Sequence, residues 1–244
     1  MSEEFRQRSI RHKLARMEPR AADIAISTGF PALDTALGAG GLPRGRIIEL
    51  FGPSSCGKTT LAIQIVAHAQ KSGSTAAWLD ADHTFDPAYA RELGLAIEDL
   101  PIAQPDSAEQ ALEITRQLAL SQAVDVIVVD SAAALVPKLE LEAGIGTSGP
   151  GLHSRVMASG LYRLSSIARR SGGSFLFLNQ TRSSAEGETS AGGAPLKLHA
   201  AVRVTLTAIG GKRIRFRVLK NKAGEAFQEG ELVWAPRLGF VESP

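Results

Sequence analysis

The sequence predicts an α/β fold in which a mostly parallel central sheet carries helices on both faces. A strand-like apolar run at residues 46–51 leads through a glycine-rich loop into a helical pattern that starts at Lys58. Further apolar runs at residues 76–80, 124–130 and 174–179 have the composition of strands buried on both faces. Such strands, when they alternate with helices, are typical of parallel sheets covered on both sides.

Helical periodicity fills the intervals between these strands. Residues 107–120 are predicted to form a helix that Ser107 caps, with Gln110 at its third position. Residues 153–170 have the same periodicity. Beyond Lys197 the apolar residues recur with a period of two, which predicts half-exposed strands.

Composition limits the functional classes. A chain of 244 residues with 44% hydrophobic content can form one α/β domain with an appended segment. No apolar run reaches the length of about 18 residues that a membrane helix needs, and the N-terminus lacks the apolar stretch of a signal peptide. Because the single cysteine, Cys56, cannot form an internal disulfide, we expect a reducing, cytoplasmic location.

The net charge of +2 is unevenly distributed. No acidic residue occurs between Thr189 and Gly224, where all the charged side chains are cationic. They are Lys197, Arg203, Lys212, Arg213, Arg215, Arg217, Lys220 and Lys222. A basic stretch of this kind indicates a polyanionic partner, nucleic acid or nucleotide. The alternatives are a solvated strand face or an acidic protein neighbour.

Residues 52–59 read Gly-Pro-Ser-Ser-Cys-Gly-Lys-Thr, the G-x-x-x-x-G-K-T pattern of loops that hold nucleotide phosphates. The glycines let successive backbone N–H groups surround an anion, and the following helix adds the positive end of its dipole. Lys58 can reach the β- and γ-phosphates, and Thr59 can bind Mg²⁺. The alternative, a plain glycine turn, is disfavoured by the flanking strand and helix. Cys56 could carry a reactive thiol of low pKa, although a small residue tolerated in the loop is the simpler interpretation.

Polar residues end the next apolar strands. Asp130 has the position of a second Mg²⁺ ligand, acting through water beside the phosphates, and an aspartate that caps the next element is the alternative. Asn179 and Gln180 bring neutral amides to the same edge, where open α/β sheets bind ligands. Two segments rich in Gly and Ser, residues 143–151 and 182–195, are candidates for mobile functional loops.

The N-terminal residues 1–22 form a basic segment in which apolar residues recur at roughly helical spacing. The segment is too short to fold alone, so we expect it to dock on a protein partner or on a neighbouring subunit. A frayed tail is the alternative.

The ordered motifs resemble the ATPase core of the RecA recombinase family, from about residue 24 to residue 235. These motifs are I-S-T-G at 26–29, A-L-G-A-G-G-L-P at 36–43, the phosphate loop, D-P-A-Y-A-R at 86–91, Q-P-D at 104–106, the strand 125–130 with Ser131, I-G at 145–146, N-Q at 179–180, G-G at 192–193 and K-N-K at 220–222. The resemblance implies a RecA-type P-loop NTPase core over residues 23–244, without the family's C-terminal domain.

The resemblance also implies site residues, with ATP and Mg²⁺ as cofactors. The ATP-binding set is Gly52, Pro53, Ser54, Ser55, Cys56, Gly57, Lys58, Thr59, Thr60, Asp86 and Tyr89, with Thr59 and Asp130 at the metal. The catalytic set is Lys58, Asp82, Gln180, Lys220 and Lys222. The DNA-binding set is Arg155, Arg182, Gly192 and Gly193.

Each of these roles follows from the family's pattern. Asp82 would orient the attacking water, and Gln180 would sense the γ-phosphate. Asp86 and Tyr89 would flank the adenine, Tyr89 by stacking. Lys220 and Lys222 would enter the ATP site of a neighbouring subunit and stabilise transition-state charge there. Single-stranded DNA and further copies of the chain are therefore the expected partners.

The sequence departs from the family's pattern at four points. Asp82 replaces a glutamate, and Pro150 stands where the first loop usually has methionine. The second loop is shorter and lacks large apolar side chains between Arg182 and Gly192. The chain also ends at Pro244. We therefore expect slow ATP hydrolysis, weak binding of single-stranded DNA and poor strand exchange.

Two functional hypotheses remain open. The first is an ATP-dependent protein of DNA repair and recombination that forms a filament or a small oligomer. The second is an accessory adaptor of a mutagenic translesion-polymerase cassette, which binds protein partners. The shortened loops favour the adaptor, and the retained Lys220 and Lys222 favour the filament. A third, KaiC- or helicase-like ATPase is disfavoured by the motifs at residues 26–43 and 220–222.

Overall fold

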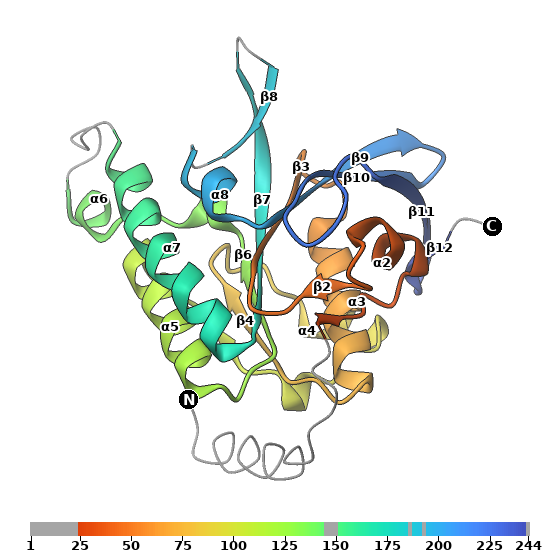
Figure 1. Ribbon diagram of the computed structural model, residues 1–244, viewed down its shortest axis with the longest axis horizontal. Coiled ribbons are helices and arrows are strands. Elements are labelled where there is room, and N and C mark those ends of the chain that lie inside the picture. Colours follow the sequence, from red (N-terminus) through yellow and green to blue (C-terminus); the bar gives the residue numbers. More distant parts are fainter. Residues whose placement is uncertain (1–23, 144–150, 185–186, 192–193, 243–244) are drawn as a thin grey trace.

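The computed structural model describes residues 24–143, 151–184, 187–191 and 194–242, with only the backbone described at residues 182–184 and 187–189. Its main sheet has ten strands (Figure 1). In spatial order they are β12 (Gly239–Glu242), β11 (Glu229–Ala235), β10 (Arg213–Asn221), β9 (Val202–Gly210), β3 (Ile47–Gly52), β7 (Ser174–Ser184), β6 (Val126–Asp130), β4 (Ala76–Asp80) and β5 (Ile102–Ala103), with β8 (Gly187–Ser190) pairing with β7 outside this order. A separate small sheet joins β1 (Ala25–Ile26) to β2 (Leu42–Pro43).

The main sheet is parallel in its centre and antiparallel at one side. The strands from β9 through β3, β7, β6 and β4 to β5 all run parallel. The last strands, β10, β11 and β12, form an antiparallel meander. The predicted α/β fold with a mostly parallel sheet is therefore confirmed. The meander accounts for the period of two, since burial alternates along β10 from Arg213 to Val218.

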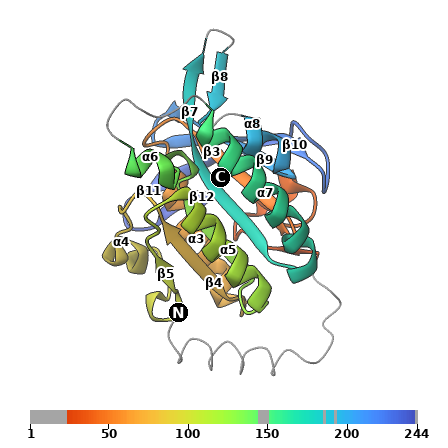
Figure 2. The same cartoon turned by 90° about the vertical axis from the view of Figure 1, so that its left-hand side faces the viewer.

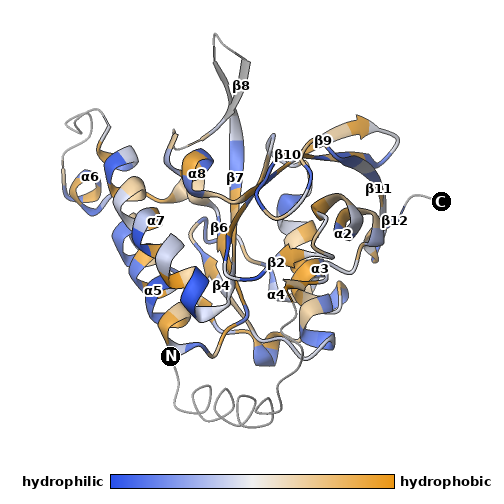
Figure 3. Ribbon diagram, in the orientation of Figure 1, coloured by the Kyte–Doolittle hydropathy of each residue, from blue (hydrophilic) through white to orange (hydrophobic). Residues whose placement is uncertain are grey.

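Helices cover both faces of the sheet (Figure 2). One face packs against α2 (Pro31–Leu37), α3 (Lys58–Lys71) and α4 (Pro87–Glu92), the other against α5 (Ala108–Ser121), α7 (Leu152–Ser171) and α8 (Ala194–His199). Two buried apolar clusters correspond to these two faces. Figure 3 shows the apolar residues gathered in the central strands. The short elements are α6 (Lys138–Glu142) and the 3₁₀ turns η1 (Ile97–Asp99) and η2 (Ala132–Ala134).

Most predicted elements are found with small shifts at their ends. Ser107 caps α5 as expected, because its hydroxyl accepts a hydrogen bond from the backbone N–H of Gln110 (3.3 Å). The segment 182–195 differs from the prediction. β7 continues to Ser184 and pairs with β8, so much of the expected loop is a β-hairpin that projects from the sheet (Figure 1).

Some predictions concern residues outside the described ranges. The N-terminal segment 1–22, Pro150, Gly192 and Gly193 belong to this group, and the expectations for them remain predictions. Within the described ranges, no helix combines the length and the apolarity that crossing a bilayer requires.

Candidate nucleotide-binding site

The parallel strands bring the predicted polar residues to one edge of the sheet. Asp80 at the end of β4 is the pairing partner of Asp130 at the end of β6. Gln180 of β7 pairs with Gly52, the last residue of β3 and the first of the phosphate loop. Because the carboxyl ends of parallel strands are where open α/β sheets bind ligands, this edge is the candidate site.

The phosphate loop begins and ends with glycines that have no room for a side chain. A Cβ on Gly52 would overlap the carbonyl oxygen of Leu206, and a Cβ on Gly57 would overlap the ring of Phe240. Gly57 also has a φ of +92°, in the left-handed region that favours glycine. Tight packing behind the loop therefore excludes a side chain at both positions.

Lys58 begins α3, and its ammonium group folds back over the loop. Nζ donates to the carbonyl oxygens of Gly52 (3.1 Å) and Pro53 (2.7 Å). Phosphate oxygens can replace such carbonyl acceptors and gain a stronger, charge-assisted hydrogen bond. The N-terminus of α3 adds free N–H groups and the positive end of the helix dipole.

Thr59 and Asp130, the two predicted metal ligands, are in direct contact. Thr59 Oγ1 donates to Asp130 Oδ2 at 2.8 Å. Burial, aided by the nearby carboxylates of Asp82 and Asp80, raises the pKa of Asp130 to about 6 against the opposing effects of Thr59 and Lys58. Three carboxylates thus crowd one place, and a divalent cation there would relieve their repulsion.

This arrangement fits a Mg²⁺ ion that is bound together with a nucleotide. Mg²⁺ in such sites takes one or two protein ligands and completes its octahedral shell with phosphates and water. The hydroxyl of Thr59 and the carboxylate of Asp130 supply such a pair. Among the residues that the structure describes, no group of three or more His, Cys, Asp or Glu is suited to hold a metal by itself.

Asp82, the predicted water-orienting residue, lies beside this pair. Its backbone N–H donates to the carbonyl oxygen of Asp130 at 3.2 Å. The buried carboxylate of Asp80 fixes the turn that follows, because it accepts hydrogen bonds from Thr84 N (3.0 Å) and Gln104 Nε2 (3.0 Å). Asp82 is therefore held at the edge of the sheet while its side chain stays half-exposed.

Asp86 and Tyr89, the predicted adenine-flanking pair, lie next to the first turn of α3. The hydroxyl oxygens of Tyr89 and Thr60 are 3.1 Å apart. The carboxylate of Asp86 accepts hydrogen bonds from Ala88 N (2.8 Å) and Tyr89 N (3.1 Å) and so caps α4. Asp86 thus has a structural task that the sequence interpretation did not include.

Cys56 does not have the reactive character considered from the sequence. Its side chain is buried, and burial raises the pKa of the thiol despite the nearby Lys58. A buried, neutral thiol is a poor nucleophile. The simpler interpretation, a small residue packed in the loop, is therefore the one that the structure supports.

Lys220 lies on β10, two strands away from β3, and Lys222 follows the end of that strand. Lys220 Nζ donates to the carbonyl oxygens of Lys197 (2.9 Å) and Leu198 (3.0 Å) near the C-terminus of α8. Burial, with Lys222 and Arg203 nearby, lowers the pKa of Lys220. Lys222 is exposed. Within one chain, Lys220 therefore bonds to α8 and not to the phosphate loop.

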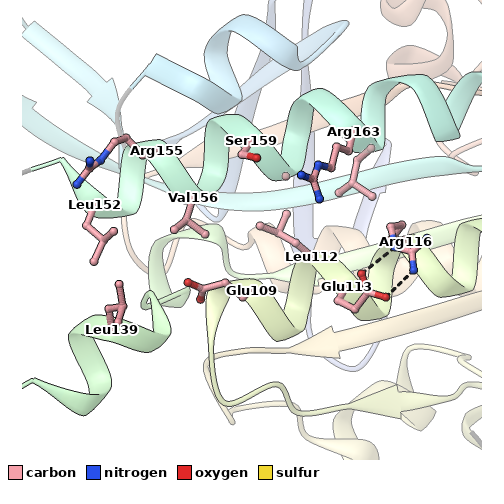
Figure 4. Close-up of a pocket in the computed structure, with 12 residues that line it drawn as sticks. Glu109, Leu112, Glu113, Arg116, Leu139, Leu152, Arg155, Val156, Ser159 and Arg163 are labelled. Atoms are coloured by element: carbon pink, nitrogen blue, oxygen red, sulfur yellow. Dashed lines mark hydrogen bonds and ion pairs between the residues drawn. The ribbon is translucent and has the colours of Figure 1, made fainter.

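Arg155 lies on α7 and lines a groove of about 550 Å³ between α5 and α7. Figure 4 shows Ser159 and Arg163 on the same helix, facing Glu109 and Glu113 of α5. Arg163 was not predicted, although residues at intervals of four share one face of a helix. The side chain of Arg182 and both Gly192 and Gly193 lie outside what the structure describes.

The basic stretch is less free than its sequence indicates. Arg213 and Arg215 both pair with Glu231 of β11 (3.3 and 2.8 Å), and Arg217 lies 3.8 Å from Glu229. An acidic neighbour was one of the alternatives, and here the neighbour is the next strand of the same chain. The net field of this face is therefore weaker than a stretch of unpaired cations would produce.

Sequence reasoning missed the support behind the phosphate loop. The ring of Phe240 lies against Gly57, and Gln64 of α3 exchanges hydrogen bonds with the backbone N–H (2.7 Å) and carbonyl (2.9 Å) of Phe240. β12 is thereby fixed to the helix that begins at Lys58. No local pattern in the sequence indicates a contact between segments so far apart.

A family model described as the RecA N-terminal domain matches residues 2–235. The chain belongs to the RecA family. The resemblance drawn from the motifs is thus confirmed, and the sheet with its phosphate loop is a RecA-type P-loop fold.

Curated RecA proteins are similar to this RecA-family chain over most of its length. "Protein RecA" of Gluconobacter oxydans is 47% identical over 227 residues, 87% of this chain and 66% of that protein. "Protein RecA" of Chloroflexus aggregans is 47% identical over 90% of this chain and 66% of that protein, and that of Thermus thermophilus is 46% identical over 90% and 69%. The chain spans about two thirds of the length of these relatives. Their names do not support the alternative of a translesion-polymerase adaptor.

Proposed function

We propose that this chain is an ATP-binding protein of DNA repair and recombination that binds single-stranded DNA when ATP is bound. The observation that carries the proposal is the strand edge where Lys58, the Thr59–Asp130 pair and Gln180 lie around the phosphate loop. Membership of the RecA family supports it, since the curated relatives are named RecA. The cytoplasm is the corresponding location.

Each residue at the edge has a task in this proposal. Lys58 and the N–H groups of the loop would neutralise and orient the phosphates. Thr59 and Asp130 would hold Mg²⁺, which when bound neutralises charge on the β- and γ-phosphate oxygens. Asp82 would orient the attacking water, and Tyr89 would face the base. Gln180, next to Gly52, would sense whether the γ-phosphate is present.

Slow hydrolysis is part of the proposal. A side chain that is one methylene shorter than glutamate holds the attacking water less well, and a misplacement of about 1 Å can reduce the rate roughly 100-fold. The proposed protein therefore spends most of its cycle with ATP bound.

The α7 face and the hairpin β7–β8 are the proposed DNA contacts. The start of α7 and the hairpin lie at the same end of the molecule (Figure 1). Arg155, Ser159 and Arg163 place donors along about 12 Å of helix, at a rise of about 1.5 Å per residue. In the described part of the chain neither arginine has an ion-pair partner within 4.0 Å. Donors of this kind position a phosphate backbone without reading its sequence.

The double variant Arg155→Ala/Arg163→Ala tests the DNA contacts. We expect binding of a labelled single-stranded oligonucleotide, with a non-hydrolysable ATP analogue present, to weaken about tenfold or more at low salt. The salt dependence should become shallower, because each lost phosphate contact reduces the slope by about one. Arg169→Ala/Arg170→Ala, at the exposed opposite end of α7, is the matched control. Equal losses in both double variants, or binding that is indifferent to nucleotide, would contradict the proposal.

A further inference from the structure

A buried ion pair connects the strand that leads into the phosphate loop with the neighbouring strand β9. Glu49 of β3 is fully buried, and Arg203 of β9, its pairing partner, is 7% exposed. Arg203 Nε donates to Glu49 Oε2. A buried ion pair is weak support for stability, because the cost of removing two charges from water offsets their attraction. Its other contacts therefore indicate what it does.

Those contacts go to the base of the hairpin β7–β8. Asn179 Nδ2 donates to Glu49 Oε1 (2.9 Å) and to the carbonyl oxygen of Ala191 (3.0 Å). Arg203 also donates to Ser190 Oγ at 3.2 Å. The ion pair thus contacts Asn179, which directly precedes Gln180 on β7, and Ser190, the last residue of β8.

The same group of residues reaches Gln180 and the root of the phosphate loop. Asn179 Oδ1 accepts a hydrogen bond from the backbone N–H of Gln180 at 2.9 Å. The guanidinium of Arg203 lies 4.5 Å from the centre of the Phe51 ring. Phe51 directly precedes Gly52 and is the pairing partner of Asn179. One ring contact and one ion pair therefore connect the start of the loop to the base of the hairpin.

We propose that Glu49 and Arg203 are positioning residues that hold Gln180 and the base of hairpin β7–β8 in a fixed relation to the phosphate loop. Together with Asn179 and Ser190 they form a clamp, defined here by these four residues. When a nucleotide occupies the site, the clamp then changes how readily the backbone hydrogen bonds of the hairpin open. This coupling rests on the proposed nucleotide site, whereas the clamp itself exists without nucleotide.

Two mild variants test the clamp in the nucleotide-free protein. Ser190→Ala removes the hairpin hydroxyl that accepts a hydrogen bond from Arg203. Arg203→Lys keeps the positive charge opposite Glu49 but loses the planar fork that reaches two partners and stacks on Phe51. Ser174→Ala is the matched control, because Ser174 is equally buried on β7 and loses one hydrogen bond, to Pro43, at the other end of the strand.

Hydrogen exchange of the backbone amides in residues 180–191 is the first measurement. We expect roughly fivefold faster exchange there in Ser190→Ala and Arg203→Lys, as the loss of one buried hydrogen bond implies, with the rest of the sheet unchanged. Ser174→Ala should leave the hairpin at the wild-type rate. Wild-type exchange of the hairpin in both clamp variants, or an equal rise across the whole sheet, would overturn the clamp.

The second measurement adds a saturating non-hydrolysable ATP analogue and Mg²⁺, with affinity determined by calorimetry. We expect hairpin exchange to change on binding in the wild type and to change less in the two clamp variants, at an affinity within about threefold of wild type. A hairpin that does not respond in the wild type, although the analogue binds, would overturn the coupling. Absence of analogue binding in the wild type would refute the proposed function, and with it the coupling, while the nucleotide-free exchange still decides the clamp.

Discussion

Asp130, a metal ligand of the proposed site, is a residue that destabilises the fold when no cation is bound. Its carboxyl group is buried beside two other carboxylates, and these causes raise its pKa from 3.8 to about 6. A carboxyl with a raised pKa in the folded protein destabilises the fold at neutral pH, since the folded state must lose the proton that it binds more tightly. At neutral pH the ionised Asp130 therefore lowers the free energy of unfolding, and a bound cation would offset this loss.

Asp130→Asn should therefore stabilise the protein when nucleotide and Mg²⁺ are absent. The gain over wild type should be near zero below pH 4, where the carboxyl is protonated in both the folded and the unfolded chain. It should grow between pH 4 and pH 6, where the unfolded chain loses the proton first, and reach about 1–3 kcal/mol above pH 6. Denaturant unfolding in EDTA at pH 4.5 and pH 7.5 measures it. A wild type that is more stable than the variant at pH 7.5 would contradict this account of Asp130.

At the scale of elements, the phosphate loop is fixed from behind by a strand distant in the sequence. β12 brings Phe240 against Gly57, and Gln64 ties β12 to α3. The loop is thus backed by a contact between β12, the last described strand, and α3, the helix that begins at Lys58. This packing supports the conformation of the loop from the side of β12.

Gly57→Ala tests this packing. The new methyl group would overlap the Phe240 ring and would also force alanine into the left-handed region. Gly73→Ala is the control, because Gly73 has a φ of +80° but nothing within 4 Å of its Cβ position. We expect the free energy of unfolding to fall by about 1–2 kcal/mol in Gly73→Ala from backbone strain alone. It should fall by about 1–3 kcal/mol more in Gly57→Ala because of the added overlap. Equal losses in thermal or denaturant unfolding would show that Phe240 yields to the methyl group.

The elements that could be predicted are those with local signals. The spacing of Gly52, Gly57 and Lys58, and the rule that parallel strands end at one edge, were sufficient to bring Asp130 and Gln180 to the phosphate loop. The sequence predicts a loop where the structure has the hairpin β7–β8, because this Gly- and Ser-rich segment lacks the apolar alternation of a strand. The Glu49–Arg203 pair and the contact of Phe240 with Gly57 could not be predicted, since they join segments far apart in the chain.

At the scale of the whole molecule, one chain contains the phosphate loop but keeps Lys220 away from it. Lys220 bonds to α8, and Lys222, just beyond the end of β10, is exposed. The resemblance to the RecA family implies that these paired lysines enter the ATP site of a neighbouring subunit. The site is thus expected to be complete only when chains associate.

Hydrolysis should therefore depend on protein concentration. We expect specific ATPase activity to rise between nanomolar and tens of micromolar protein as chains associate, because Lys220 and Lys222 of one chain would stabilise transition-state charge in the site of another. Mixing Lys58→Ala chains with Lys220→Ala/Lys222→Ala chains should restore part of the activity that each variant lacks alone. Specific activity that is flat over this range, with no restoration on mixing, would show that each chain hydrolyses ATP by itself.

The measurement that tests the central claim most directly is isothermal titration of the protein with a non-hydrolysable ATP analogue and Mg²⁺. The wild type should bind one analogue per chain. Lys58→Ala should lose about tenfold or more in affinity, because it lacks the ammonium group that now donates to the loop carbonyls and would donate to the phosphates. Lys71→Ala, at the exposed opposite end of α3, should bind like the wild type. Analogue affinity that is unchanged in Lys58→Ala, or equally reduced in both variants, would contradict the claim that this edge of the sheet holds a nucleotide.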